Sequence, residues 1–211
     1  LYIVPSEQLP SPDAARQLVQ ERLPEGIEVE LDATYKAMVS YKAKNYALLD
    51  EDGKMHLTGA ALRSRGMEPY LRNFINDYML RVLLERDSEL ADLYDGYVQK
   101  LERHEFPLRE LCKRENLSMD PGNYRDKLDK GETKRSAPYE LALAAPAGNF
   151  TAGCSVIYYV TGEKKSVSVV DNSKMLDEKS TLRDENVAYY LSKLAQVYEK
   201  FGGADAARRS D

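Results

Sequence analysis

Basic and aromatic side chains interleave in one short part of the chain, residues 41–65, which reads YKAKNYALLDEDGKMHLTGAALRSR. Lysine and arginine neutralise phosphates, and tyrosine adds a flat ring and a hydroxyl, so this combination is typical of surfaces that meet a polyanion. The acidic residues of the same part are confined to one turn, DEDG, at residues 50–53. An ordinary exposed hairpin is the alternative interpretation. The candidate binding residues are Lys42, Lys44, Tyr46, Arg63 and Arg65.

A second group of basic side chains lies in the polar stretch 118–136. This stretch contains a Pro-Gly pair and has no apolar period, so we expect a loop of a length usually reserved for function. Acidic residues are interspersed with its cations, and a solvated connector is the alternative. The cations are Arg125, Lys127, Lys130, Lys134 and Arg135.

Catalytic and metal-binding patterns are largely missing. The sequence has no GxSxG, P-loop, HExxH or GxGxxG motif. Cys112 and Cys154 belong to no CxxC or Cys/His cluster, so we expect two reduced thiols. His56 and His104 stand alone, which disfavours a histidine-built metal site. The acidic DEDG turn could hold a cation, but a turn between strands explains it more simply.

The net charge of −5 is distributed unevenly over the 211 residues. Residues 1–34 carry two basic and seven acidic side chains, which equals the whole net charge, whereas residues 35–75 carry seven basic and four acidic ones. An acidic total therefore does not exclude an anionic partner. No apolar run of 18 residues and no signal-sequence pattern occurs, so we expect neither a membrane partner nor secretion.

Periodicity predicts the elements of the first part of the chain. Residues 1–4 read as a strand end, and an amphipathic helix is expected to follow Asp13. Residues 27–31 (IEVEL) alternate like a half-buried strand. Three further strands are expected at 35–41, 45–49 and 54–58, the last two joined by DEDG as a hairpin.

Helical spacing dominates after Gly66. The apolar pattern predicts a helix over 67–83, a second over 90–101 that Ser88 caps, and a short third opened by Pro107 over 107–117. The remaining expected elements are a helix at 139–145, strands at 156–161 and 166–170 joined by GEKK, and a final helix over 187–201 that ends at Gly202-Gly203.

These elements indicate an α+β chain with three parts. Residues 1–66 form an antiparallel sheet unit, 67–203 a mostly helical domain with a small β-hairpin, and 204–211 a tail or linker. The chain begins with Leu1 rather than Met, so we expect a piece of a longer protein.

The order of residues 41–74 resembles a segment of family B DNA polymerases. In that family a KKRY-like motif of the palm domain leads into a strand, a DG turn, a second strand and an arginine pair that opens the thumb domain. Lys44 and Tyr46 match the motif, while Ala43 and Asn45 replace its first lysine and its arginine. Of the arginine pair, Arg65 matches. Residues 136–176 and 183–201 are similar to the thumb, so the resemblance covers about 24–201.

The resemblance implies the C-terminal palm remnant and the thumb of a DNA-directed DNA polymerase. Lys44 and Tyr46 would then reach the minor groove of primer–template duplex, Arg65 a phosphate, and the cations of 118–136 the backbone. The parent would transfer nucleotides with Mg²⁺, whose carboxylate ligands are expected upstream of Leu1. We therefore expect no catalytic residue in this chain and no polymerisation by the chain alone.

The resemblance also implies partners and a location. The partners are primer–template duplex DNA and the rest of the polymerase chain, in an intracellular setting, the cytoplasm or nucleoid. No glutamine-led clamp-binding box is evident near the C-terminus, so the sequence does not support a sliding clamp. Two alternatives stay open: a module that binds protein through its acidic N-terminal part, and a degenerate polymerase relative that binds DNA without catalysis.

Overall fold

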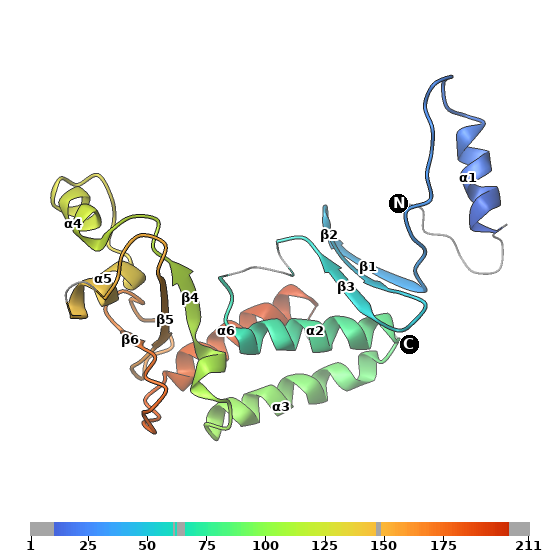
Figure 1. The fold of residues 1–211 in the computed structure, drawn as a ribbon. Helices are drawn as coiled ribbons and strands as arrows, with labels where there is room; N and C mark the ends of the chain where they lie inside the picture. Colours follow the sequence, from blue (N-terminus) through green and yellow to red (C-terminus); the bar gives the residue numbers. More distant parts are fainter. Residues whose placement is uncertain (1–10, 61, 63–65, 147–148, 203–211) are drawn as a thin grey trace.

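The computed structural model describes residues 11–60, 62, 66–146 and 149–202. The fold is α+β, as expected, with two three-stranded antiparallel sheets and six α-helices in this part of the chain. Figure 1 shows the sheets at opposite ends of a layer of three helices, α2, α3 and α6. The strand expected at 1–4 and the tail 204–211 lie outside the described residues.

The N-terminal arm packs little against the rest. Helix α1 (Pro12–Gln20) begins after Ser11, whose Oγ accepts a hydrogen bond from Ala14 N, and none of its residues is buried. Figure 1 shows it standing apart from the other elements. The helix confirms the expected pattern after Asp13.

The strand expected at 27–31 is wrong for this structure. The side chain of Gln20 engages this backbone instead, since its Nε2 donates to Ile27 O (2.6 Å) and its Oε1 accepts from Val29 N (2.8 Å). Ile27 and Leu31 are each 49% exposed. A strand needs a neighbouring strand for its ladder, and none lies beside this segment within the described ranges.

Sheet A consists of β1 (Ala37–Lys42), β2 (Asn45–Leu49) and β3 (Met55–Thr58), in that order. The three expected strands are confirmed, and the DEDG turn joins β2 to β3. Strand alternation places Ala47 and Leu49 in the core with α2, while Tyr46 and Leu48 point to the opposite face. One face of sheet A therefore packs on helices and the other does not belong to that core.

The helical layer follows the predicted spacing closely. It consists of α2 (Pro69–Leu83), α3 (Leu90–Glu102) and α6 (Val187–Lys200), and α6 ends before Gly202, which has a φ of +115°. The cap expected at Ser88 is wrong, because Ser88 lies inside a 3₁₀-helix, η1 (Asp87–Glu89), that leads into α3. None of the described helices is both long and apolar enough to cross a membrane.

Sheet B replaces the single hairpin expected in the second half. It consists of β4 (Lys113–Asn116), β5 (Ser155–Val160) and β6 (Ser173–Met175), with β5 in the centre. The helix expected at 107–117 is wrong: it is reduced to a 3₁₀-turn, η2 (Leu108–Leu111), because β4 pairs with β5 and this buries Leu111 and Leu117. Local spacing does not reveal a partner about 40 residues away.

The strand expected at 166–170 is also wrong, because the chain forms β6 only at Ser173. Residues 161–172 are an ordered loop held by two asparagines. Thr161 N donates to Asn172 O (2.8 Å), and the Nδ2 of buried Asn186 donates to Lys164 O (2.9 Å). These contacts fix a loop of residues 161–172 where two strands joined by GEKK were predicted.

The polar stretch 118–136 contains a helix, α4 (Pro121–Asp129), so the prediction of a loop over the whole stretch is wrong. The ring of Tyr124 stacks on Tyr139 (4.4 Å, 16°) of α5 (Ala137–Ala144), the helix expected at 139–145. Leu128 joins the same cluster. Two apolar residues in nine are too few to show a helical period, which explains the miss.

Candidate nucleic-acid interface

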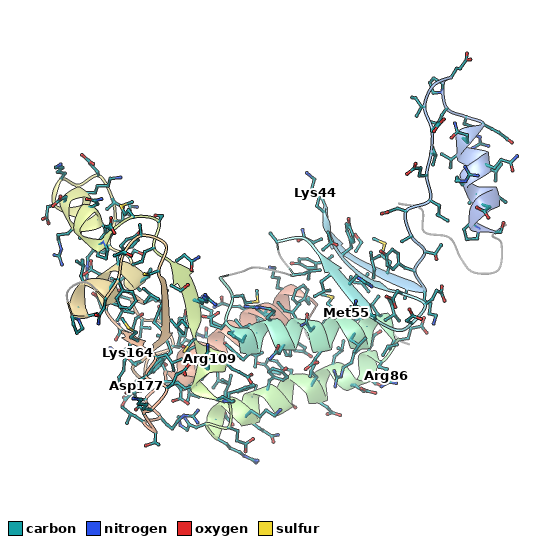
Figure 2. All side chains as sticks on the ribbon, in the orientation of Figure 1. Lys44, Met55, Arg86, Arg109, Lys164 and Asp177 are labelled. Atoms are coloured by element: carbon teal, nitrogen blue, oxygen red, sulfur yellow. The ribbon has the colours of Figure 1, made fainter. Side chains whose placement is uncertain are left out.

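The tip of the β1–β2 hairpin presents Lys44. Residues 43–44 form the turn between Lys42 and its strand partner Asn45, and Lys44 takes a left-handed φ of +63°. Figure 2 shows Lys44 at this tip, pointing away from the helices. The side chain is exposed and makes no ion pair or hydrogen bond with the described part of the chain. Lys44 is therefore available to an external anion.

Asn45 stabilises this turn. Its Nδ2 donates to Ala43 O (2.9 Å), so its amide folds back onto the hairpin. Gly59 packs beneath, at a φ of +101°; a Cβ there would lie 2.3 Å from Lys44 O and 2.2 Å from Asn45 Oδ1. Both the left-handed φ and the lack of space for a Cβ therefore require glycine at position 59. Asn45 therefore acts on the conformation of the tip.

The other four candidates of this segment divide into two cases. Tyr46 is half-buried on the outer face of β2, between its strand partners Ser40 and Thr58. The side chain of Lys42 lies outside the described structure, as do Arg63 and Arg65. The structure therefore places Lys44 and Tyr46 at one end of sheet A and does not describe the other three side chains, and binding by all five stays a prediction.

Tyr41, which adds to the aromatic content of the segment, packs inward. Its ring meets Phe201 edge-on, with centroids 4.7 Å apart, and Lys200 Nζ lies 5.6 Å from its centroid. The contact fastens the hairpin to the end of α6. Tyr41 thus serves packing.

The acidic turn lies at the opposite end of β2 from Lys44, and its Asp50 is hydrogen-bonded to nearby residues of the same hairpin. Asp50 Oδ1 accepts from Asp52 N (3.1 Å) and Lys54 N (2.8 Å), and its Oδ2 lies 2.7 Å from His56 Nε2. The hydrogen bond with His56 lowers the pKa of Asp50 below its usual value. Lys36 pairs with Glu51. In the described residues, no group of three His, Cys, Asp or Glu side chains could hold a metal ion.

Helix α4 and the residues after it display four exposed cations far from sheet A (Figure 1). Asp126 and Asp129 lie among them on the helix surface, so the charge is mixed. Within the described structure, no hydrogen bond or ion pair engages these basic side chains. They are Arg125, Lys127, Lys130 and Lys134.

Arg135 differs from these four. Its Nη1 lies 2.7 Å from Asp171 Oδ1, and its Nε lies 3.7 Å from Glu140 Oε1. The hydrogen bond with Asp171 raises the pKa of Arg135 above its usual value. Asp171 and Glu140 offset the charge of this guanidinium and occupy part of its donors, so Arg135 is less available to a phosphate than the other four cations.

The loop 161–172 adds cations that the sequence pattern did not single out. Lys164 and Lys165 are exposed there, and Lys193 of α6 lies above the Tyr189 ring at 5.4 Å. A hollow of about 380 Å³ between this loop and α6 is lined in part by Lys165, Lys193 and Tyr189. The two consecutive lysines of GEKK are visible in the sequence. The expected turn at GEKK did not indicate that they share a surface with α6.

Comparison with known proteins finds similarity to solved structures. No protein-family model matches the chain, and no curated protein matches it. Solved structures that share the fold include family B DNA polymerase. The enzyme from the hyperthermophilic archaeon Pyrobaculum calidifontis matches with a TM-score of 0.67 and 18% identity, over 90% of this chain and 24% of that chain. The chain thus has the fold of a portion of a family B DNA polymerase and spans about a quarter of that protein's length.

Proposed function

We propose that this chain is the C-terminal palm and thumb portion of a family B DNA polymerase, which holds primer–template duplex during DNA synthesis. The observation that carries the proposal is the match of 90% of the chain to such a polymerase at a TM-score of 0.67. Presentation of Lys44 at an exposed hairpin tip supports it independently. A role in DNA synthesis implies an intracellular location.

The proposed contacts follow from the chemistry of the duplex. Purine N3 and pyrimidine O2 acceptors occur in the minor groove of every base pair, so donors such as the Lys44 ammonium and the Tyr46 hydroxyl can bind there without reading sequence. Lys42, Arg63 and Arg65 complete this contact in the proposal. The exposed cations of α4 and the pair Lys164 and Lys165 bind phosphates further along the duplex.

Nucleotide transfer itself belongs to the parent protein in this proposal. It requires carboxylates that hold Mg²⁺ near the primer end. In the proposal these carboxylates belong to another part of the parent protein, and this chain binds and orients the duplex.

Duplex affinity measured at several salt concentrations tests the proposal. A fluorescently labelled primer–template duplex should bind the chain, more weakly as salt rises. The double variant Lys44→Ala with Arg65→Ala should lower the magnitude of the log–log salt slope by about 0.9 for each lost phosphate contact. Lys36→Ala is the matched control, because Lys36 pairs with Glu51 at the other end of the sheet. Absence of duplex binding, or equal slopes in all variants, would refute the assignment.

A second candidate is a polymerase relative that keeps duplex binding but has lost catalysis. The engagement of Asn45 with the hairpin backbone favours it, because this residue replaces a cation of the family motif and does not restore the charge. Primer extension by the protein in its natural full length separates the two candidates. Extension supports the polymerase, and duplex binding without extension supports the relative.

A further inference from the structure

A hollow of about 380 Å³ lies between the loop 161–172 and α6, and we call it the α6 hollow. The loop forms one of its walls. The helix forms the other with side chains whose spacing places them on one face of α6: Tyr189, Ser192, Lys193 and Gln196. Ligand pockets typically measure about 300–1,000 Å³, so this volume suits a small ligand.

The loop wall of the α6 hollow is held in place by contacts within the chain. The Nδ2 of buried Asn186 donates to Lys164 O (2.9 Å). Val167 and Val169, which line the hollow, also pack against the apolar cluster of sheet A and the helical layer. The loop wall is therefore formed before any ligand binds.

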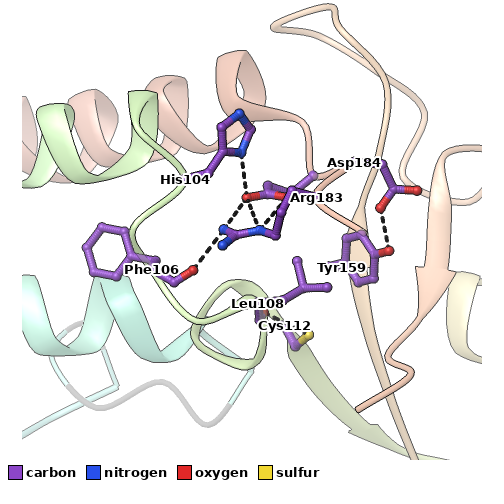
Figure 3. A network of polar contacts seen from close by, with 8 residues as sticks. His104, Phe106, Leu108, Cys112, Tyr159, Arg183 and Asp184 are labelled. Carbon is purple, nitrogen blue, oxygen red and sulfur yellow. Dashed lines mark hydrogen bonds and ion pairs between the residues drawn. The ribbon is translucent and has the colours of Figure 1, made fainter. Parts of the chain in front are cut away.

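The helix wall begins at a braced junction with sheet B. Glu185, directly before α6, is buried and bridges to Thr161 at the end of β5. Its Oε1 lies 2.8 Å from His104 Nδ1 and also pairs with Arg183, whose Nη2 donates to Phe106 O (2.9 Å), as Figure 3 shows. A ligand thus does not have to order either wall, which favours binding.

The side chains of the α6 hollow are suited to an anion. Two ammonium groups, two hydroxyls and one amide line it, from Lys165, Lys193, Ser166, Ser192 and Gln196. None of the described lining residues is acidic, and neither lysine forms an ion pair within the part of the chain that the structure describes. Lysines, hydroxyls and amides are the side-chain groups that donate hydrogen bonds to phosphate oxygens. The hollow therefore has the charge and the donors for a phosphate group.

Two acids near the α6 hollow do not line it. Glu68 is buried directly before α2, and Lys113 Nζ lies 3.9 Å from its Oε1. Burial raises the pKa of Glu68 above its usual value, and Lys113 and Lys193 oppose this. Glu163 is exposed and lines a neighbouring hollow together with Lys164. Each acid thus has another lysine nearby, which leaves the two lysines of the α6 hollow for a ligand.

We propose that the α6 hollow binds a phosphate monoester attached to a sugar, as found in a free nucleotide or at the 5′-phosphorylated end of a strand. Lys165 and Lys193 bind the phosphate from the two walls. A monoester carries close to two negative charges at neutral pH and so matches two lysines, whereas a phosphodiester within a strand carries one. Val167 and the ring of Tyr189 offer the sugar an apolar contact.

This site goes beyond the proposed duplex contact. A continuous duplex presents phosphodiesters along its outside, whereas the α6 hollow takes one terminal phosphate. Lys165 belongs to both proposals, and Lys193 belongs to the hollow alone. The test uses no duplex, so its failure and the failure of the duplex contact are distinguishable.

Titration of the whole chain with thymidine 5′-monophosphate, followed by NMR, tests the site. We expect the amide signals of residues 162–169 and 189–196 to shift, and unphosphorylated thymidine to leave them unchanged. Lys165→Met and Lys193→Met should each weaken binding about tenfold, because each removes a charged hydrogen-bond donor.

Lys164→Met is the matched control. It removes the same charge from the same loop, but Lys164 lines the neighbouring hollow and not the α6 hollow. This variant should change the affinity by less than about twofold. Signals that stay unchanged, equal binding of thymidine and its monophosphate, or an equal loss in all three lysine variants would overturn the proposal.

Oligonucleotides distinguish the two sources of the phosphate. A single strand with a 5′-phosphate is compared with the same strand carrying a 5′-hydroxyl. A larger shift of the same amide signals with the phosphorylated strand assigns the hollow to strand ends. Equal shifts with both strands, together with binding of the monophosphate, assign it to free nucleotides.

Discussion

Sheets A and B are both three-stranded and antiparallel, yet they present their cations differently. At the tip of sheet A, Lys44 is exposed and meets no acceptor in the described structure. Around sheet B, several basic side chains are held by acceptors of the same region: Arg109 by Glu178, Arg114 by Ser155, Arg135 by Asp171, and Lys174 by Asp184. Cations counted from the sequence therefore overstate the binding surface near sheet B.

The two regions also differ in their cores. Sheet A shares one large aromatic-rich cluster with α2, α3 and α6, whereas α4, α5 and much of sheet B form a smaller one. Strand β5 contributes to both, through Val160 in the larger cluster and Val156 in the smaller. We infer that the helical layer with sheet A is the more stable region, and that the region of sheet B opens more readily.

The largest effect should come from the larger core. Phe74 is fully buried among aromatic rings, with the Tyr97 centroid at 5.2 Å. Phe74→Ala should lower the free energy of unfolding by about 3–5 kcal/mol, measured by urea denaturation. The control Leu84→Ala, at a residue that is 41% exposed, should change it by less than about 0.5 kcal/mol.

The smaller core provides the contrast to that variant. Leu117→Ala should increase hydrogen exchange in α4 and α5 while α3 keeps its protection, because Leu117 belongs only to the smaller cluster. Equal loss of protection in both regions would show that the two cores unfold as one unit.

The next effect concerns the tip of sheet A. Gly59→Ala should destabilise the chain by about 1–3 kcal/mol, since it combines a strained backbone with a Cβ too close to Lys44 O and Asn45 Oδ1. Gly53→Ala is the control: its φ is +79°, but no atom lies within 4 Å of the new Cβ. Thermal denaturation should therefore rank Gly59→Ala below Gly53→Ala, and the reverse order would contradict the close packing at the tip.

Acid should weaken the junction at sheet B. Burial alone would raise the pKa of Glu185, but hydrogen bonds from Arg183 and His104 outweigh it and lower the pKa below its usual value. The stabilisation is therefore present above the unfolded pKa of about 4.3 and is lost as the pH falls through the folded pKa. Melting temperatures between pH 6 and pH 3 should fall less steeply in Glu185→Gln. An unchanged slope would exclude Glu185 as a source of acid sensitivity.

Glu68 should show the opposite sign. Its pKa is raised, so ionisation above the unfolded pKa of about 4.3 opposes folding. Glu68→Gln should therefore raise the melting temperature at pH 8, and the difference should shrink towards pH 4. A lower melting temperature at pH 8 would mean that Lys113 outweighs the cost of burial.

The smallest expected effect is on duplex binding. It compares a cation without an ion pair and a paired cation near sheet B. Arg125→Gln should lower the magnitude of the salt slope of duplex binding by about 0.9 if this side chain meets one phosphate. Arg135→Gln should leave that slope unchanged, because Arg135 already pairs with Asp171 and Glu140. A loss in Arg135→Gln equal to that in Arg125→Gln would show that these ion pairs open on binding.

The candidate site could be predicted only in part. The sequence predicted both strands that flank Lys44, because they are local, while the role of Lys44 in binding stays a prediction. The pattern did not show that Asn45 and Tyr41 serve the hairpin itself, or that Arg135 is paired. It also missed the lysines of the loop 161–172, which become a surface only when Asn186 holds that loop against α6.

By itself the sequence determined the α+β class, the three long helices and the strands of sheet A. Each of these follows from apolar spacing or a turn signal within about 15 residues, so neighbouring residues suffice to specify them. Segment 27–31 shows the limit of prediction from local patterns. Its alternation is clear, but the described structure gives it no strand partner.

Only the tertiary structure decided how sheet B forms, which cations have no acceptor nearby, and which carboxylates are buried. Strand β4 depends on β5 across about 40 residues, and Arg135 depends on Asp171 across 36. Glu68 gains its raised pKa from burial at a junction of distant elements. The physical reason is the same in each case: pairing, charge neutralisation and desolvation depend on neighbours in space, which a local pattern does not specify.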